Sequence, residues 1–215
     1  MIDLLFSSPL PPQLPAPLVL ASTSRYRQAQ LARLGVPFTC VAPDYGEPPV
    51  PGVAAADLPL RHAIEKVRAV ARARNDGAWI LGADQGVVLG TGPQSVLLGK
   101  PHTAERAVDQ LLSLAGGPHL LRTGVALWRP SAPVATRVVD VTLWMRPLSR
   151  VQAEAYVNAD QPLDCAGSYR IESRGPWIFA RAHGDDPTAI EGLPLLAVTD
   201  LLLCALAECG RQAAG

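Results

Sequence analysis

The amino-acid sequence predicts an α/β protein in which helices flank one mixed, twisted β-sheet. Short apolar runs alternate with stretches of helical periodicity along the chain, which is typical of this class. Two long strand-like runs, 120–128 and 134–144, follow one another and favour an antiparallel pair within the sheet. With 215 residues, of which 48% are hydrophobic, the chain is long enough for one sizeable core or two closely joined lobes.

Charge and cysteine content argue against several classes of partner. Nineteen basic residues balance nineteen acidic ones, so no global positive field would attract nucleic acid. The four cysteines show neither a C-x-x-C pair nor metal-ligand spacing with the four histidines, and we expect reduced cysteines in a cytoplasmic protein. The apolar run 2–6 is too short for a signal peptide or a membrane span. We therefore expect neither nucleic-acid nor membrane partners.

The first seventeen residues form a proline-rich leader that we expect to be disordered. Prolines at positions 9, 11, 12, 15 and 17 remove backbone donors and favour an extended, unpaired conformation. A single folded domain is then expected over residues 18–215.

Residues 18–34 predict a buried strand, a hydroxyl-rich turn and a helix that begins at Arg25 with Ser24 as its N-cap. Two arginines in a first helical turn add to the positive end of the helix dipole, at about 0.3–1 kcal/mol per charge. An anion bound there would relieve the misfit. The turn combines hydroxyls such as that of Ser22 with free backbone N–H groups and arginines. This combination indicates a phosphate-binding site. The alternative is a surface turn with two solvated arginines.

The next elements carry a lysine and an aspartate that attract attention. Segments 38–42, 57–74 and 79–83 predict a strand, a helix and a second buried strand. Lys66 falls at the edge of the helix's apolar stripe, so its stem can pack on the core while its ammonium reaches a cleft; a solvated lysine is the alternative. Asp84 follows the buried strand directly, where a carboxylate is costly unless it caps a loop or does chemistry. We favour chemistry.

A loop at 43–49 separates the first strand pair from the helix. It carries two acidic residues, one of them Glu47, which are either solvated or placed to reach a metal. A hairpin with arms 87–89 and 95–98 is expected further along, and it returns Lys100 to the neighbourhood of Asp84.

The remaining elements have clear boundary signals. They are a helix at 103–115, the antiparallel pair, a helix at 149–158 that starts with a Ser149–Gln152 capping box, a strand at 177–182 and a helix at 194–209. Leucines cover most of the circumference of the last helix, as in a helix buried in the core or in a subunit interface.

Seven short motifs occur in order along the chain. They are LASTSRYR at 20–27, EK at 65–66, GADQ at 82–85, GKP at 99–101, TG at 123–124, CAGSYRIE at 165–172 and GLPL at 192–195. Together they resemble the Maf family of nucleoside triphosphate pyrophosphatases. Gln85 after the aspartate, and Glu172 after the Ala-Gly-Ser-Tyr loop, resemble the 7-methyl-GTP branch, whereas the dTTP/UTP branch typically has threonine and glutamine there.

The resemblance implies roles for particular residues. Asp84 would be the catalytic proton acceptor, and the family's cationic residues would be Arg27, Lys66 and Lys100. The substrate-binding set, which joins the family's specificity positions to the hydroxyl turn, would be Ser22, Ser24, Tyr26, Gln85 and Glu172. A divalent cation, Mg²⁺ or Mn²⁺, would be held by Asp84 and Glu47.

The resemblance also implies a fold of the inosine-triphosphatase type, with two lobes around a cleft, and a homodimer. Two positions depart from the family pattern: Arg25 stands where a proline is usual, and Ser173 stands where a glycine is usual. We expect the first to affect the turn and the second to affect the base pocket.

The predicted activity is hydrolysis of a nucleoside triphosphate, an acid anhydride, between its α and β phosphates. Attack of water on the α-phosphorus builds negative charge on phosphoryl oxygens, which the cations would stabilise while Asp84 orients or deprotonates the water. The expected substrate is 7-methyl-GTP. Two alternatives stay open: a dTTP/UTP pyrophosphatase of the same family, and a nucleotide-sensing cell-division regulator that binds without turnover and does not need Asp84.

Overall fold

The computed structural model describes residues 10–213. Its strands are β1 (Leu18–Ala21), β2 (Phe38–Val41), β3 (Trp79–Leu89), β4 (Val96–Leu98), β5 (Pro118–Trp128), β6 (Ala135–Met145) and β7 (Phe179–His183). Its α-helices are α2 (Arg25–Ala32), α3 (Leu58–Arg72), α4 (Ala104–Leu114), α5 (Arg150–Asp160) and α6 (Leu195–Ala213).

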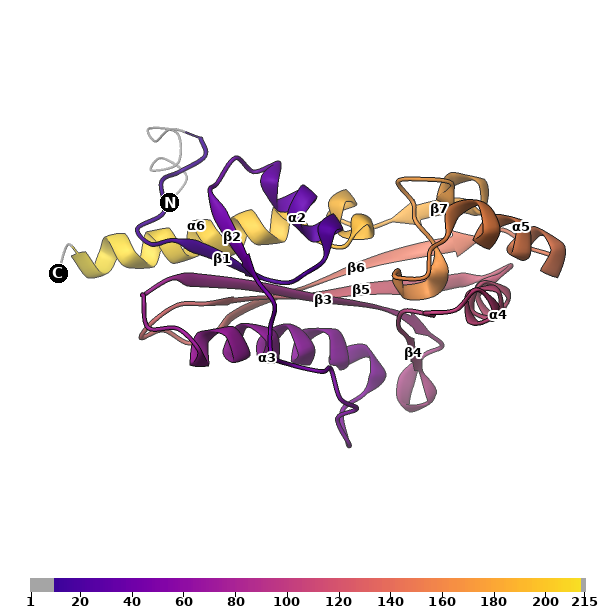
Figure 1. The fold of residues 1–215 in the computed structure, drawn as a ribbon, viewed down its shortest axis with the longest axis horizontal. Coiled ribbons are helices and arrows are strands. Elements are labelled where there is room, and N and C mark those ends of the chain that lie inside the picture. The colour runs from indigo at the N-terminus through magenta and orange to yellow at the C-terminus, as the bar shows by residue number, and fades with distance from the viewer. Residues whose placement is uncertain (1–9, 214–215) are drawn as a thin grey trace.

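All seven strands belong to one sheet, with the order β2-β1-β3-β5-β6-β7 and β4 paired to β3 outside this path. β1 runs parallel to β2 and β3, whereas β3, β5, β6 and β7 are successively antiparallel. Helix α3 lies on one side of the sheet, and α2 and α6 lie on the other (Figure 1). The predicted mixed sheet with flanking helices is confirmed.

Buried apolar side chains form three groups around this sheet. One group packs α4 and α5 against the β5–β6 end and includes Leu111, Leu143 and Tyr156. The other two lie on opposite faces of the β1–β3–β5 region, because successive side chains of a strand point to opposite faces. Leu20 packs with α2 and α6 on one face, while Val19 packs with α3 on the other.

The predicted helix starts are confirmed. Ser24 and Thr103 accept hydrogen bonds from the backbone N–H groups three residues ahead, and the Ser149–Gln152 capping box is complete. These signals are local in sequence, so they do not depend on the rest of the fold.

Asp84 does not lie at the end of its strand, and that expectation is wrong. β3 continues without a break to Leu89, so the predicted strand and the first arm of the predicted hairpin are one strand. Asp84 pairs with Gly124 and Gln85 pairs with Thr123 in the β3–β5 ladder. The polar Asp-Gln pair resembles a loop in sequence, but both side chains line a cavity instead of facing bulk water.

Residues 1–9 of the leader lie outside the described part of the chain. Leu14 and Ala16 pack against the core group that contains α2 and α6. The carbonyl of Pro17 accepts a hydrogen bond of 2.8 Å from the N–H of Trp79. The expectation of an unpaired leader is therefore wrong for its last residues, because the apolar side chains between the prolines contact the core.

The four cysteines are free thiols, as expected. Between residues 10 and 213, no helix has the length and apolar character needed to cross a membrane.

Two glycines allow α3 to lie unusually close to the sheet. A Cβ atom built on Gly124 would lie 2.5 Å from the backbone nitrogen of Leu60, and one on Gly82 would lie 2.6 Å from a methyl group of Val67. Real Cβ atoms do not approach backbone atoms this closely, so any side chain at Gly124 would push the helix away. The close approach brings Lys66, six residues beyond Leu60 on α3, to the strand that carries Asp84.

Candidate active site

A cavity of about 1070 Å³ opens beside β3. Its wall is built from segments that are far apart in sequence, namely the turn at 21–27, the loop at 42–47, α3, β3, and residues 97–102, 164–172 and 190–192. Ten side chains predicted to form the site all line it: Ser22, Ser24, Tyr26, Arg27, Glu47, Lys66, Asp84, Gln85, Lys100 and Glu172. The fold therefore brings every predicted site residue together, while their chemical roles stay predictions.

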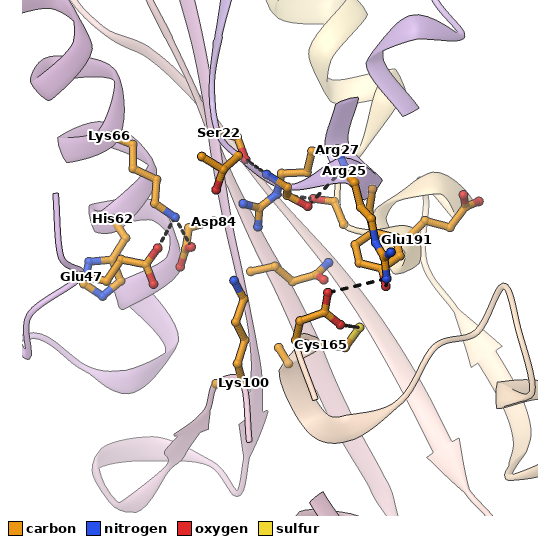
Figure 2. A pocket seen from close by; sticks show the side chains of 18 of the residues that line it. Ser22, Arg25, Arg27, Glu47, His62, Lys66, Asp84, Lys100, Cys165 and Glu191 are labelled. Atoms are coloured by element: carbon orange, nitrogen blue, oxygen red, sulfur yellow. Dashed lines mark hydrogen bonds and ion pairs between the residues drawn. The ribbon is translucent and has the colours of Figure 1, made fainter. Parts of the chain in front are cut away.

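Lys66 lies between two carboxylates, as Figure 2 shows. Its Nζ atom is 2.5 Å from Oδ1 of Asp84 and 2.5 Å from Oε1 of Glu47. Lys66 and Asp84 are buried, so the alternative of a solvated lysine is wrong. Burial raises the pKa of Glu47, but the Lys66 ammonium, with Lys100 and His62 further off, outweighs this and holds the pKa below its usual range.

The backbone at Glu47 is in the left-handed region, with φ at 52°. This conformation costs a non-glycine residue roughly 1–2 kcal/mol, and such strain tends to gather at functional sites. The ion pair with Lys66 accompanies this strained conformation. Glu47 thus remains exposed to solvent at the cavity wall, and its carboxylate is paired with Lys66.

The first turn of α2 forms another part of the wall. Ser22 Oγ accepts a hydrogen bond of 3.1 Å from the N–H of Ser24, and Nε of Arg27 donates one of 3.1 Å to the carbonyl of Gly192. This first turn has no acidic residue to offset its arginines. Arg27 thus adds a fixed positive charge to a helix N-terminus that faces the cavity, which is the arrangement expected for phosphate binding.

The hydrogen bonds of Gln85 fix which end of its amide faces the cavity. Its Nε2 atom donates to Oγ1 of Thr123 at 2.8 Å and to the carbonyl of Ala189 at 2.6 Å. A carbonyl only accepts, so the contact with Ala189 sets the orientation of the amide. Both N–H groups are used, and Oε1 is left as an acceptor for a ligand.

The hydroxyl of Tyr26 receives two guanidinium donors. Nη2 of Arg25 lies 2.8 Å from it, and Nη1 of Arg170 lies 3.3 Å from it. The guanidinium of Arg25 also stands over the Tyr26 ring, 4.9 Å from its centroid. The residue that replaces the usual proline therefore covers one face of this ring, and a base that stacks on Tyr26 has to use the other face.

Glu172 lies at the edge of the same end of the cavity. Burial raises the pKa of its carboxyl above the ordinary value, and the nearby Glu191 carboxylate adds to the rise. Arg170 and Arg174, which are close to Glu172 in sequence, approach Asp160 at 3.6 Å and 3.5 Å. Two carboxylates, Glu172 and Glu191, thus line the cavity at this end.

Sequence reasoning missed His62 and Tyr45, which also line the cavity. Nδ1 of His62 and the hydroxyl of Tyr45 are 2.9 Å apart, and His62 is buried. His62 precedes Lys66 by four residues, which puts both on one face of α3, and this spacing was the signal available in the sequence.

The comparison with known proteins agrees with this geometry. Residues 17–205 match the model of a family described as Maf-like protein. The chain belongs to the Maf family. Within it, the chain is 45% identical to the 7-methyl-GTP pyrophosphatase of Pseudomonas putida, over 86% of this chain and 95% of that one. It is 42% identical to the 7-methyl-GTP pyrophosphatase of Thiobacillus denitrificans, over 86% and 90% respectively.

The fold of this Maf chain is similar to that of a solved structure. It matches the Ham1 protein of Staphylococcus aureus with a TM-score of 0.50 at 14% identity, over 89% of this chain and 98% of that one. At this low sequence identity the match is evidence for a shared α/β fold and is not evidence for a shared function.

Proposed function

We propose that this Maf protein hydrolyses 7-methyl-GTP between its α and β phosphates, giving 7-methyl-GMP and pyrophosphate. The observation that carries the proposal is that one cavity joins the Lys66–Asp84 pair to a helix N-terminus and, at its other end, to acceptor groups that suit a cationic purine. The similarity to proteins named 7-methyl-GTP pyrophosphatases supports the same substrate.

At the phosphate end, the start of α2 with Arg27 and Lys100 supplies fixed positive charge for the triphosphate. Asp84 orients and deprotonates the water that attacks the α-phosphorus. Lys66 holds the Asp84 carboxylate in one orientation through their short hydrogen bond. The pyrophosphate leaves opposite the attacking water, so no protein nucleophile is required.

A divalent cation fits the donor set of this cavity. Among the residues that the structure describes, there is no cluster of three or more His, Cys, Asp and Glu side chains suited to a metal. Mg²⁺, however, is commonly held by one or two carboxylates together with substrate phosphates and waters. Glu47 and Asp84 converge on a single positive charge, that of Lys66, and would hold Mg²⁺ or Mn²⁺. Such an ion would neutralise charge on the phosphates.

At the base end, an amide acceptor and two carboxylates lie beside the guanidinium groups of Arg25 and Arg170. Methylation of N7 gives guanine a delocalised positive charge, and its Watson–Crick edge carries N–H donors at N1 and N2. Oε1 of Gln85 and the carboxylates of Glu172 and Glu191 match both properties. Uracil and thymine present one N–H between two carbonyls, which suits this set of acceptors less well. The geometry thus favours 7-methyl-GTP over dTTP and UTP.

The substrate assignment is tested by Glu172→Gln. We expect the preference for 7-methyl-GTP over GTP to fall by about 1.5–3 kcal/mol, because the amide keeps the shape of the side chain but loses its charge. The measurement is the ratio of kcat/KM for the two nucleotides, in which their shared phosphates cancel. Glu154→Gln removes a charge outside the cavity, where Glu154 approaches Arg150 at 3.9 Å, and serves as the matched control. A wild type without preference, or a ratio that survives Glu172→Gln, would contradict the assignment.

Arg27→Ala tests the phosphate end. Turnover of every triphosphate should fall by a similar factor, because a phosphate contact carries no information about the base. Thermal stability without ligand should change little, since the lost hydrogen bond to Gly192, worth about 0.5–1.5 kcal/mol, is offset by removing a cation from a positive helix end. Arg68→Ala, which breaks an exposed ion pair with Glu65 away from the cavity, is the control. If the kinetic constants of Arg27→Ala equal those of wild type for every nucleotide tested, Arg27 does not bind phosphate and is a solvated surface residue.

Pyrophosphate release by the wild-type chain distinguishes the enzyme from the alternative, a regulator that binds a nucleotide without turnover. The homodimer implied by family resemblance is part of the proposal, and the molar mass of the purified chain in light scattering tests it.

A further inference from the structure

A buried carboxylate outside the proposed catalytic cluster lies behind the base end of the cavity. It belongs to Asp160, the last residue of α5, and its side chain has no exposed surface. The Tyr156 hydroxyl donates to Oδ2 at 2.8 Å, and the Ser173 hydroxyl donates to Oδ1 at 2.5 Å. The guanidinium groups of Arg170 and Arg174 approach Oδ1 at 3.6 Å and 3.5 Å. Nothing in the proposed reaction uses this group.

Arg170 connects this carboxylate to the cavity. Its Nη2 faces Asp160, while its Nη1 donates to the hydroxyl of Tyr26, and its backbone N–H donates to the hydroxyl of Tyr156 at 3.0 Å. A free arginine side chain samples many rotamers, at about 2 kcal/mol of entropy. Contacts at both ends of the guanidinium select one of them. Arg170 is thereby held against Tyr26 in the cavity wall.

The same carboxylate also ties down the segment that carries Glu172. Arg170 precedes Glu172 by two residues, Ser173 follows it directly and Arg174 comes next, and all three contact Asp160. The position of the Glu172 backbone is thus fixed from both sides by one buried group. Ser173, which replaces the family's usual glycine, supplies the shortest of these contacts.

We propose that Asp160 is a positioning residue for base selectivity, which holds Arg170 and the Glu172 segment so that the base end of the cavity accepts a cationic purine. This inference rests on the proposed function. Charge gives the reason. Asp160 offsets the positive charge of Arg170, which lines the cavity. Without that offset, an uncompensated guanidinium next to the base would repel 7-methylguanine and leave neutral guanine nearly unaffected.

Asp160→Asn tests the proposal. The ratio of kcat/KM for 7-methyl-GTP over GTP should fall about tenfold, through KM for 7-methyl-GTP, while kcat for GTP stays within about twofold of wild type. A role in stability alone would change both nucleotides together. In a Glu172→Gln background, Asp160→Asn should lower the ratio by less than in wild type, because the part of its effect that acts through Glu172 is already lost while the part that acts through Arg170 remains.

Two further variants keep the test decisive. Ser173→Ala removes one donor at an exposed position, so it decides the question if Asp160→Asn fails to fold, and it should lower the ratio severalfold. Glu208→Gln breaks the ion pair with buried Arg129, away from this cavity, and should lower thermal stability with the ratio unchanged.

The outcomes separate the two proposals. A wild type that shows no preference for 7-methyl-GTP overturns the proposed function. A wild type with the preference, whose ratio is unchanged in both Asp160→Asn and Ser173→Ala, overturns the role of Asp160 while the proposed function stands.

Discussion

Replacing Asp84 by asparagine is expected to lower kcat by roughly 10²–10⁴-fold, the usual scale for loss of a positioned acid–base group. Asparagine has the same shape, and its side-chain oxygen can still accept the hydrogen bond from Lys66, so the fold and nucleotide binding should persist. What is lost is the negative charge that accepts the proton of the attacking water. Pyrophosphate release measures the rate, and calorimetry with a nucleotide measures binding.

Asp140→Asn is the matched control for this experiment. Asp140 lies in the same sheet and pairs with Arg122 in the neighbouring strand, but it does not line the cavity. Its replacement should leave kcat unchanged. Pyrophosphate release at the wild-type rate from Asp84→Asn would remove Asp84 from the mechanism.

Gly124→Ala is expected to destabilise the chain by about 1–3 kcal/mol or more, the range for overpacking a filled core. The added methyl group would meet backbone atoms of Leu60, which cannot move aside as a flexible side chain can. Strand propensity acts in the opposite direction, because glycine inside a strand is worse than alanine by roughly 0.5–1 kcal/mol. Thermal unfolding should show a fall in Tm of about 2–4 °C for each kcal/mol lost.

Activity should fall with stability in this variant, because α3 carries Lys66. If α3 moves away from the sheet, the distance between Nζ of Lys66 and Oδ1 of Asp84 increases from its present 2.5 Å. Gly117→Ala is the control, since a Cβ atom there would meet nothing within 4 Å. Equal Tm values for Gly124→Ala and wild type would show that α3 tolerates displacement and that the glycine does not set this approach.

Much of the fold was predictable from sequence because its signals are local. The N-caps at Ser24 and Thr103 and the capping box at Ser149 are satisfied by residues three positions away, so they appear in any short window. The end of β3 was not predictable in this way. The Asp-Gln pair at 84–85 is polar, and only the partner strand β5 shows that the ladder continues through it.

The predicted site residues do meet in one cavity. They could be identified from sequence because the motifs that contain them occur in order along nearly the whole chain. Sequence left open what each side chain does there. Lys66 was either solvated or turned to a cleft, and packing of α3 over two glycines decided that it lies between two acids. Arg25 was expected to alter the turn, and the structure shows its guanidinium over the ring of Tyr26.

The sequence by itself therefore determined the order of most elements, the helix starts and the set of residues around the cavity. The tertiary structure decided which polar atoms of these side chains are bonded within the protein and which face the cavity. Gln85 offers an acceptor to the cavity because a carbonyl 104 residues away occupies its amide nitrogen. Asp160 lies behind the base end because three residues around Glu172 fold back onto it. A hydrogen bond needs its donor and acceptor at one distance and angle, and for residues far apart in sequence only the folded chain sets both.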